Sequence, residues 1–303
     1  MGKRCRDISD NSLARVFVKE ILGVSKKHEI ENAVNQIVEA ELGIDKVSSL
    51  PTVTHENYRN DPYVSSSDRR LLRDTVFEEL ITLKRLDDAD EIELGKGGCL
   101  PVSTNAQQGK QLYLIIGLPA SGKSSLADLI CESTGSVLVD SDYAKRKLPE
   151  YHTKVNGASL VHKESQIIIM GDPSNEEALS VYQWGLSHKM NMVYPCIGNK
   201  YKEIIALTQN VIDVFGYDVH LILVNLDRIK ATKRAYTRYM ETKRYIPLSK
   251  IYDEYANDPA LTYYIAKEQY CDLFKSFTHF DTDVPRKERY RIICQTDFSP
   301  IAL

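Results

Sequence analysis

The stretch LYLIIGLPASGKSS, residues 112–125, decides the fold of this chain. A short apolar run, 112–116, meets a glycine, and the eight residues from Gly117 fit the spacing G-x-x-x-x-G-K-[ST]. Glycines at these places let backbone N–H groups turn inward around a phosphate, while Lys123 neutralises its charge and the Ser124 hydroxyl can ligate Mg²⁺. The sequence therefore predicts a nucleotide-binding P-loop made of Gly117, Leu118, Pro119, Ala120, Ser121, Gly122, Lys123, Ser124 and Ser125.

The segments on either side of this loop are those that a P-loop requires. A buried parallel strand should precede it, and the apolar run 112–116 supplies one. A helix should follow it, and residues 123–133 carry apolar side chains at helical spacing. The alternative is a glycine-rich strand-to-helix turn with an incidental lysine, and both flanking segments argue against it.

The composition is that of a globular protein with no global attraction to nucleic acid. The 303 residues suffice for one large domain or two ordinary ones. Hydrophobic residues make up 43% and charged residues 27%, and the net charge of −3 lacks the basic excess of most nucleic-acid binders. We therefore expect a small-molecule substrate and no nucleic-acid partner.

Cysteine usage and the lack of long apolar segments predict a cytoplasmic protein. The six cysteines show no C-x-x-C pair and no Cys/His ligand spacing, so reduced thiols are expected in place of disulfides or zinc ligands. Residues 1–12 lack the apolar core of a signal peptide, and no run approaches the roughly 18 apolar residues of a membrane span.

The N-terminal part of the chain predicts three amphipathic helices. The first ends near Gly23, the second ends near Gly43, and the third begins with Asp68 as its N-cap and runs to Leu86. The acidic run 87–93 is typical of a solvated helix end, and a polar, glycine-rich segment follows it. We therefore expect a small all-α bundle as an N-terminal domain, residues 1–100, followed by a larger domain, residues 108–303.

From residue 109 the pattern changes to alternating strands and helices. Apolar runs predict strands at 112–116, 136–139, 190–194 and 219–224, and two short strands around Phe280 and at 290–294. Helices are predicted at 123–133, 157–170, 175–188 and 200–215, with a largely helical basic region at 227–277. This alternation predicts an α/β fold, a parallel sheet flanked by helices on both faces.

Two carboxylates follow the second predicted strand in the segment VLVDSD. Asp140 and Asp142 come at the carboxyl end of that strand, where open α/β sheets bind ligands, so both should face the P-loop. One could accept a proton from a substrate hydroxyl, and the other could hold Mg²⁺. The alternative for either is to cap the next helix.

The basic region after the fourth predicted strand predicts a helical lid. Arg234 and Arg238 are spaced i, i+4, so one helical face can carry both. Phosphoryl transfer needs positive groups near the charge that develops on the phosphate oxygens, and many P-loop kinases supply arginines from such a lid. The alternatives are a solvated basic surface and, because tyrosines are interleaved, a face that stacks RNA bases.

With these residues in place, the chain resembles the zeta toxin family of P-loop kinases. The resemblance covers roughly 110–295 and rests on an ordered set of segments: GLPASGKSS, VLVDSDYAKRKLPEYH, GASLVHKES, NMVYPCIGN, Arg238-Tyr239 and Arg244 to Pro247. It implies a kinase that uses ATP (or GTP) and Mg²⁺ to phosphorylate a nucleotide-sugar, typically UDP-N-acetylglucosamine at its 3′-hydroxyl, which blocks cell-wall synthesis.

The resemblance also implies roles for individual residues. The implied catalytic residues are Lys123, Asp142, Arg238 and Arg244. Asp142 matches the base that activates the hydroxyl, and the two arginines match groups that stabilise the phosphate. The implied substrate-binding residues are Asp140, Asp142 and Glu164, and the implied metal ligands are Ser124 and Asp140. Judged from its helix alone, Glu164 could equally be a surface charge.

One segment departs from the family pattern and leaves the acceptor open. After the third strand the nucleotide-sugar kinases carry an acid and a threonine near E-G-T, whereas this chain reads YPCIGN at 194–199. Some relatives with a P-x-[VI]-G version of this strand end phosphorylate NAD. A nucleotide-sugar and NAD are therefore both candidate acceptors.

The predicted N-terminal helices invite a second inference. In the two-protein systems of this family a separate three-helix antitoxin covers the nucleotide site, and this chain has three predicted helices ahead of its P-loop. We hypothesise that residues 1–100 are a tethered inhibitor, for which a flexible linker would give a local concentration on the order of millimolar. A dimerisation or docking bundle is the alternative.

Two further functions fit a P-loop with basic and aromatic residues downstream. One is a polynucleotide kinase, against which the net charge of −3 argues. The other is a nucleotide-binding switch that hydrolyses slowly. The chain has no N-K-x-D guanine signature, and a DxD base would be superfluous in a switch.

Overall fold

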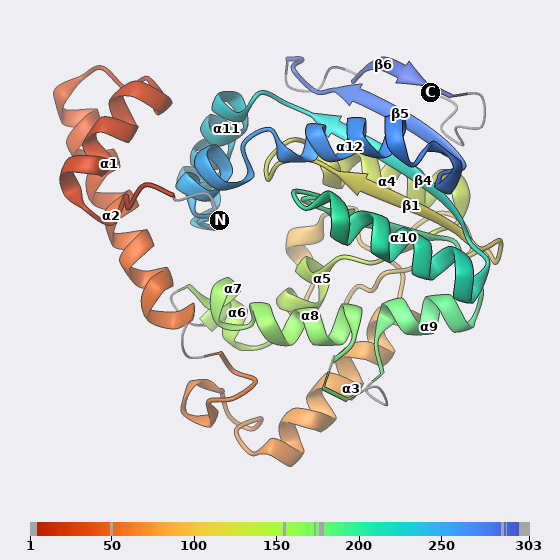
Figure 1. Cartoon of the computed structure of the whole chain (residues 1–303). Coiled ribbons are helices and arrows are strands. Elements are labelled where there is room, and N and C mark those ends of the chain that lie inside the picture. The colour runs from red at the N-terminus through yellow and green to blue at the C-terminus, as the bar shows by residue number, and fades with distance from the viewer. Residues whose placement is uncertain are drawn as a thin grey trace.

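A six-stranded sheet with the order β2-β3-β1-β4-β5-β6 forms the centre of the molecule (Figure 1). The computed structural model describes residues 5–48, 51–153, 156–172, 174–175, 179–285, 288 and 290–296. The strands are β1 (Gln111–Ile116), β2 (Val137–Leu138), β3 (Met192–Cys196), β4 (Asp218–Asn225), β5 (Ser276–Asp281) and β6 (Arg291–Gln295). Neighbouring strands in the spatial order β2-β3-β1-β4-β5 pair in parallel, and β6 runs antiparallel to β5. The α/β fold and all the predicted strands are confirmed.

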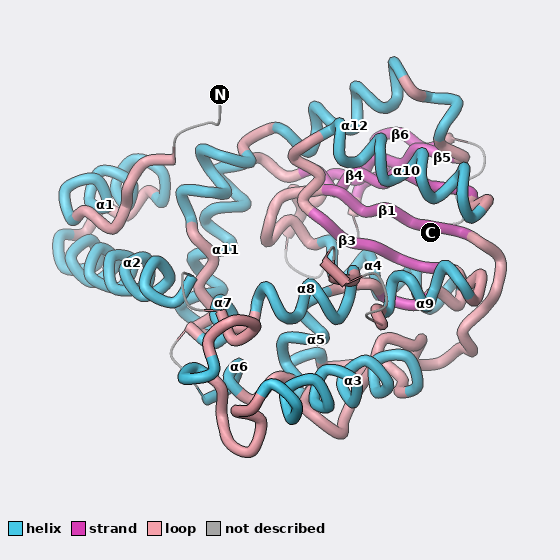
Figure 2. Tube along the Cα trace, turned by 60° about the horizontal axis from the view of Figure 1, so that its bottom comes forward, coloured by secondary structure: helices cyan, strands magenta, loops and turns pink. Residues whose placement is uncertain are grey.

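Helices cover both faces of the sheet (Figures 1 and 2). On one face α4 (Lys123–Thr134) packs against β1 and β3, and on the other α10 (Tyr201–Phe215) and α12 (Asp258–Gln269) pack against β4. The other helical elements after β2 are α5 (Ser141–Lys147), α6 (Glu150–Thr153), α7 (Gly157–Leu160), α8 (His162–Met170), α9 (Val181–Ser187), α11 (Arg228–Thr242), η4 (Lys250–Tyr255) and η5 (Cys271–Leu273). Among the described residues, no helix has both the length and the apolar character needed to cross a bilayer.

The predicted N-terminal helices are present, but they pack in two separate places. These elements are α1 (Asn11–Phe17), η1 (Val18–Leu22), α2 (Lys27–Ser48), η2 (Glu56–Tyr58), α3 (Ser66–Thr82) and η3 (Ala89–Glu91). The first three share an apolar cluster with α11 and η4, whereas α3 buries Leu72, Val76 and Leu80 in the core that contains the sheet. The expectation of one three-helix bundle is therefore wrong, because the apolar stripe of α3 packs against α5, α8 and α9.

Two expected helix ends also differ from the structure. The second helix continues past Gly43 to Ser48, so this glycine lies inside the helix and does not end it; a Cβ at this position would lie 2.2 Å from Asn156 Nδ2. The third helix is capped by Ser65 and not by Asp68. The Ser65 hydroxyl accepts from the Asp68 backbone N–H at 3.1 Å, which places Asp68 inside the first turn.

A buried histidine in β4 should make the stability of the fold depend on pH. His220 Nε2 lies 2.9 Å from Gln111 Oε1 and Nδ1 lies 2.7 Å from Ser276 Oγ, and its ring stacks on Tyr113. The neutral ring satisfies both contacts, since Nε2 donates to the amide oxygen and Nδ1 accepts from the hydroxyl. Burial, partly opposed by Asp218, lowers the pKa of His220 from 6.5 to about 4.

Acidification should therefore destabilise the protein through this residue. Between pH 6.5 and 4 the unfolded chain binds a proton that native His220 excludes, so up to about 3 kcal/mol of stability is lost as pH falls through that window. Urea unfolding at pH 7 and 4.5 should show a smaller loss in His220→Gln than in the wild type. His188→Gln, which changes an exposed histidine, should behave like the wild type. Equal pH dependence in all three proteins would contradict this prediction.

Candidate active site

The P-loop joins the end of β1 to the start of α4, as the motif predicts. Gly122 has φ +97°, a conformation that favours glycine. Gly117 packs so tightly that a Cβ would lie 2.5 Å from Val224 O in the neighbouring strand. The Ser124 side chain, in the first turn of α4, lines a pocket. Local geometry thus accounts for both motif glycines.

The motif lysine is folded back over its own loop. Lys123 Nζ donates to Gly117 O at 2.7 Å and to Leu118 O at 2.8 Å. Burial lowers the pKa of Lys123 to about 8, with nearby acidic groups, including Asp140 and Asp142, opposing the shift. The ammonium is therefore held at the loop by two carbonyls, which a phosphate could replace.

The two predicted carboxylates lie together beyond β2, and each has a distinct environment. Asp140 caps α5 by accepting from the backbone N–H of Asp142 at 2.9 Å, so the capping alternative holds for this residue. Burial, and then the charge of Asp142, raise the pKa of Asp140 to about 6. Burial also opposes the charge of Asp142, but Lys145 at 2.8 Å, Arg244 and Arg146 outweigh it and hold the pKa of Asp142 below its ordinary value.

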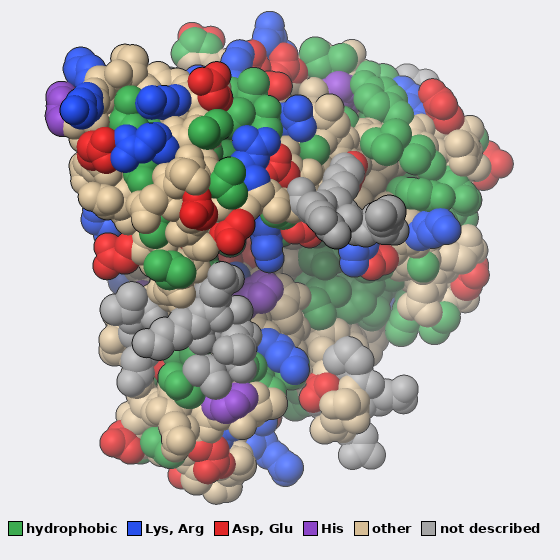
Figure 3. All heavy atoms as spheres, turned by 60° about the vertical axis from the view of Figure 1, so that its left-hand side comes forward, with side chains coloured by type: hydrophobic (Ala, Val, Ile, Leu, Met, Phe, Trp, Pro, Cys, Tyr) green, Lys and Arg blue, Asp and Glu red, His purple; other side chains and the backbone are tan. Residues whose placement is uncertain are grey.

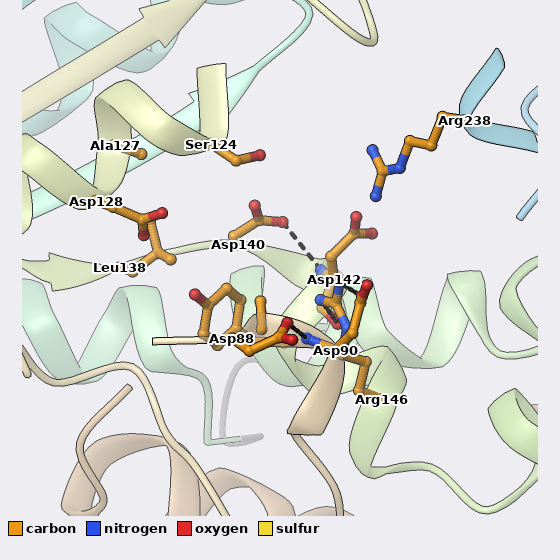
Figure 4. A pocket seen from close by; sticks show the side chains of 12 residues that line it. Asp88, Asp90, Ser124, Ala127, Asp128, Leu138, Asp140, Asp142, Arg146 and Arg238 are labelled. Atoms are coloured by element: carbon orange, nitrogen blue, oxygen red, sulfur yellow. Dashed lines mark hydrogen bonds and ion pairs between the residues drawn. The ribbon is translucent and has the colours of Figure 1, made fainter. Parts of the chain in front are cut away.

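The two arginines that the family resemblance implies, Arg238 and Arg244, lie near the same carboxylates. Arg244 Nη2 lies 3.4 Å from Asp142 Oδ2, and Arg238 lines the pocket from α11. Among the described residues the Arg238 guanidinium has no hydrogen-bond or ion-pair partner, and Figure 4 shows it on the same side of the pocket as Asp142. Arg234 is elsewhere: it donates to the backbone carbonyls of Thr282 and Val284.

Of the predicted site residues, Ser124, Asp140, Asp142 and Arg238 line a pocket of about 250 Å³, whereas Lys123 and Arg244 lie outside its lining (Figure 4). Its lining consists of Asp88, Ala89, Asp90, Ser124, Ala127, Asp128, Leu138, Asp140, Asp142, Tyr143, Arg146 and Arg238. Asp90 and Arg146 were not predicted as site residues from the sequence. The acidic run 87–93 had the pattern of a solvated helix end, and only the tertiary fold brings Asp90 to within 3.1 Å of Arg146. No local signal marks such a pair.

Glu164, the predicted substrate acid, lies outside this pocket lining. Its side chain is fully buried, and Oε2 accepts from Arg69 Nη2 and from the Thr52 hydroxyl, both at 2.6 Å. Arg69 also pairs with buried Glu150 at 2.9 Å, and Arg73 approaches Glu164 at 3.3 Å. Residues ahead of the P-loop thus occupy both oxygens of this carboxylate.

The unusual end of the third strand packs directly beneath the P-loop. Ile197 O accepts from the Gly117 backbone N–H at 3.1 Å. Gly198 has φ +70°, and a Cβ there would lie 2.5 Å from the Ile116 side chain. The sequence YPCIGN therefore supports the turn at the base of the loop, besides any contact with an acceptor.

Comparisons with known proteins identify the family of this chain. The family described as zeta toxin matches residues 99–278. A structure of the PezAT chromosomal toxin-antitoxin system of Streptococcus pneumoniae is similar in fold, with a TM-score of 0.52 and 12% identity over 78% of this chain and 84% of that one. An AvrRxo1-ORF1:-ORF2 complex with ATP aligns with a TM-score of 0.47 and 16% identity over 78% and 69% of the two chains. No curated protein matches the sequence. Because the family match spans more than half of the 303-residue chain, this chain belongs to the zeta toxin family of P-loop kinases.

Proposed function

We propose that this toxin kinase transfers the γ-phosphate of ATP (or GTP) to the 3′-hydroxyl of UDP-N-acetylglucosamine and so blocks cell-wall synthesis. The observation that carries the proposal is that three separate parts of the chain contribute to one pocket: Ser124 from the P-loop helix, Asp140 and Asp142 from the end of β2, and Arg238 from the lid. These groups are what a phosphoryl transfer needs, namely phosphate binding, a base and positive charge.

In the proposed reaction, Asp142 receives the proton of the acceptor hydroxyl. The hydroxyl oxygen forms a bond to the γ-phosphorus, and the bond from that phosphorus to the bridging oxygen breaks, so ADP leaves with the electron pair. Lys123, Arg238 and Arg244 would stabilise the negative charge on the phosphate oxygens. The low pKa of Asp142 keeps this base ionised at neutral pH.

The pocket also offers ligands that fit Mg²⁺, a cation that prefers oxygen donors. The Ser124 hydroxyl and the Asp140 carboxylate line the same cavity, and they are the residues that would hold the ion. A cation there would favour the ionised form of Asp140, whose pKa is raised by burial and by Asp142. Bound Mg²⁺ would supply neutralisation of the phosphate charge.

A transfer assay with separate acceptors tests the proposed function. The full chain is given ATP and Mg²⁺ with either UDP-N-acetylglucosamine or NAD, and Asp142→Asn serves as the blank. NAD is the second candidate because the third strand ends in YPCIGN. Product formed only from UDP-N-acetylglucosamine would support the proposal, and product only from NAD would replace it. Hydrolysis without transfer to either acceptor would favour the slow nucleotide-binding switch.

A polynucleotide acceptor has less support from the surface. On the face that includes the N-terminal helices, Lys and Arg side chains are interspersed with Asp and Glu (Figure 3). The described part of this face therefore has no continuous basic track of the kind that follows a nucleic-acid backbone.

We further propose that the helices within residues 1–100, although they pack in two places, restrain the kinase domain, residues 108–303. PezAT, which the fold resembles, is a toxin-antitoxin system, and here the N-terminal helices belong to the same chain. The cluster formed by α1, η1 and α2 includes Leu248 and Ile251 beyond the lid helix and Leu118 of the P-loop. Helices that pack on both lid and P-loop can limit how the two close around a nucleotide.

Weakening the polar contacts between the N-terminal helices and the lid should raise ATP turnover. Arg6 pairs with Asp253 at 2.9 Å, and Glu41 accepts from the Tyr245 hydroxyl at 2.6 Å. Losing two such contacts, worth roughly 1 kcal/mol each, should increase turnover by up to about thirtyfold in the full-length Arg6→Ala/Glu41→Gln variant.

A matched control separates release of the lid from simple loosening of the helices. Arg15 pairs with Glu31 at 2.5 Å within the α1–α2 pair, and among the described residues it has no hydrogen bond or ion pair with the lid. Arg15→Ala should therefore leave turnover at the wild-type level. Equal turnover in both variants would count against restraint by these helices. Substitution is preferred to deletion of residues 1–100, because deletion would remove core residues of α3.

A further inference from the structure

A carboxylate from the segment ahead of the P-loop binds two arginines, of which Arg146 lines the pocket. Asp90 Oδ1 lies 3.1 Å from Arg146 Nη2 and 3.1 Å from Arg244 Nη1. Arg146 comes from α5, the same helix that carries Asp142, and Arg244 follows the lid helix. Asp90 lies outside the family match, which begins at residue 99.

The guanidinium of Arg146 forms an anion site with which the Asp90 carboxylate pairs only in part. The Arg146 side chain is 6% exposed; its Nη1 donates to Asp142 O at 3.2 Å, and its Nη2 donates to Asp90. Its Nε is buried and has no hydrogen-bond partner among the described residues. In a guanidinium, Nε and Nη2 share one edge and can bind two oxygens of the same anion. Asp90 thus leaves half of this edge unpaired.

The positive charge around the pocket favours an anion with more negative charge and more acceptor oxygens than a carboxylate. Arg238 lines the same pocket and has no partner among the described side chains, and the like charge of Arg244 adds to burial in lowering the pKa of Arg238. Burial disfavours the charge of Asp90, but the three arginines Arg146, Arg244 and Arg238 outweigh it and keep the pKa of Asp90 below its ordinary value. A phosphate group brings more negative charge and three acceptor oxygens to the same place.

The segment that presents Asp90 is firmly held, whereas the carboxylate itself is accessible. Lys147 Nζ is buried and donates to Glu79 at 2.6 Å and to the carbonyls of Glu93 and Lys96 at 3.0 and 3.2 Å. Ile92 is fully buried beside it. The Asp90 side chain, in contrast, is 61% exposed. An incoming anion can therefore replace the carboxylate by rotation of one side chain, without opening the segment.

We infer that, in the free protein, Asp90 occupies an anion site on Arg146 that binds a phosphate of the acceptor substrate. This inference rests on the proposed function, and it narrows the acceptor to molecules with a phosphate or diphosphate group near the reacting hydroxyl. We place this site next to the acceptor and not next to ATP, because Arg146 shares helix α5 with the proposed base Asp142. Among the described residues, Asp90 also has no hydrogen bond or ion pair with a P-loop residue. Asp90 then competes with the acceptor and lowers its apparent affinity.

Binding of inorganic pyrophosphate to the full-length protein tests this inference. The P-loop is first saturated with a non-hydrolysable ATP analogue, so that titration calorimetry reports the second site. Asp90→Asn should bind pyrophosphate about tenfold more tightly than the wild type. Glu91→Gln is the matched control, because it removes the same charge from the neighbouring residue, whose carboxylate pairs with Lys96 outside the pocket. It should match the wild type.

Variants of Arg146 identify where the gain arises. In the Asp90→Asn background, Arg146→Gln should abolish the tighter binding. Arg146→Lys keeps the positive charge but loses the two parallel N–H donors of the guanidinium, so it should retain only part of the gain in affinity. Equal affinity in Asp90→Asn and Glu91→Gln would overturn the inference, as would weaker binding in Asp90→Asn, which would make Asp90 a permanent part of the site.

The same variants with organic ligands identify the source of the phosphate. UDP-N-acetylglucosamine and NAD both contain a diphosphate, and the true acceptor should show the same gain with Asp90→Asn as pyrophosphate does. If pyrophosphate responds and neither organic ligand binds, the anion site stands and the proposed acceptor fails. If UDP-N-acetylglucosamine is phosphorylated and Asp90→Asn changes neither its affinity nor that of pyrophosphate, the function stands and the anion site fails.

Discussion

Replacing Arg69 by methionine should lower the free energy of unfolding by about 3–5 kcal/mol, the typical cost of removing one partner from a buried ion pair. Arg69, Glu150 and Glu164 are all fully buried, and the guanidinium donates to both carboxylates at 2.6 to 3.1 Å. Without Arg69, Glu164 would keep Arg73 at 3.3 Å as an ion-pair partner. Glu150 would have no ion-pair partner among the described residues. Chemical denaturation at neutral pH, with the slope checked against the wild type, measures the loss.

Two further variants separate the buried cluster from a general effect of removing arginine. Arg70→Ala removes the exposed neighbour on α3 and should change the stability by less than about 0.5 kcal/mol. Arg69→Met combined with Glu150→Gln and Glu164→Gln removes the unpaired charges and should recover much of the loss. A triple variant no more stable than Arg69→Met alone would contradict the charge argument and leave packing as the cause.

The fold and the centre of the site could be predicted because their signals are local. The P-loop spacing places its glycines, Lys123 and Ser124 within eight residues, and the apolar runs that became β1 and β4 need cover on both faces. Asp140 and Asp142 follow a strand directly, so sheet topology alone directs them toward the ligand edge. The structure puts these carboxylates in the same pocket as Ser124.

What could not be predicted depends on pairs that are distant in the sequence. Arg69 lies in a run of charged and polar residues that is typical of an exposed helix start, and its partners Glu150 and Glu164 are 81 and 95 residues away. Asp90 is 154 residues from Arg244. The hydrophobic spacing indicates which face of α3 is apolar, but it does not indicate whether that face packs against α2 or against α5 and α8. Tertiary packing decided this choice.

Asp142→Asn should lower the rate of phosphate transfer by about 10² to 10⁴ while leaving ATP affinity nearly unchanged, if Asp142 is the base of the proposed reaction. The amide has the same shape as the carboxylate but cannot accept the proton of the hydroxyl. The α5 cap would persist, since it uses the Asp140 side chain and only the backbone N–H of residue 142. Single-turnover transfer and calorimetric ATP binding measure the two quantities separately.

Asp140→Asn is the comparison that assigns different roles to the two carboxylates. Its amide oxygen can still cap α5, so the loss is confined to one charge beside Ser124 and Asp142. If Asp140 helps to hold the metal, the variant should need a higher Mg²⁺ concentration for half-maximal activity and recover much of its rate at saturation, whereas Asp142→Asn should stay slow at any Mg²⁺ concentration. If added Mg²⁺ rescues Asp142→Asn and not Asp140→Asn, the two roles must be exchanged, and Asp140, with its pKa raised to about 6 by burial and by Asp142, becomes the base.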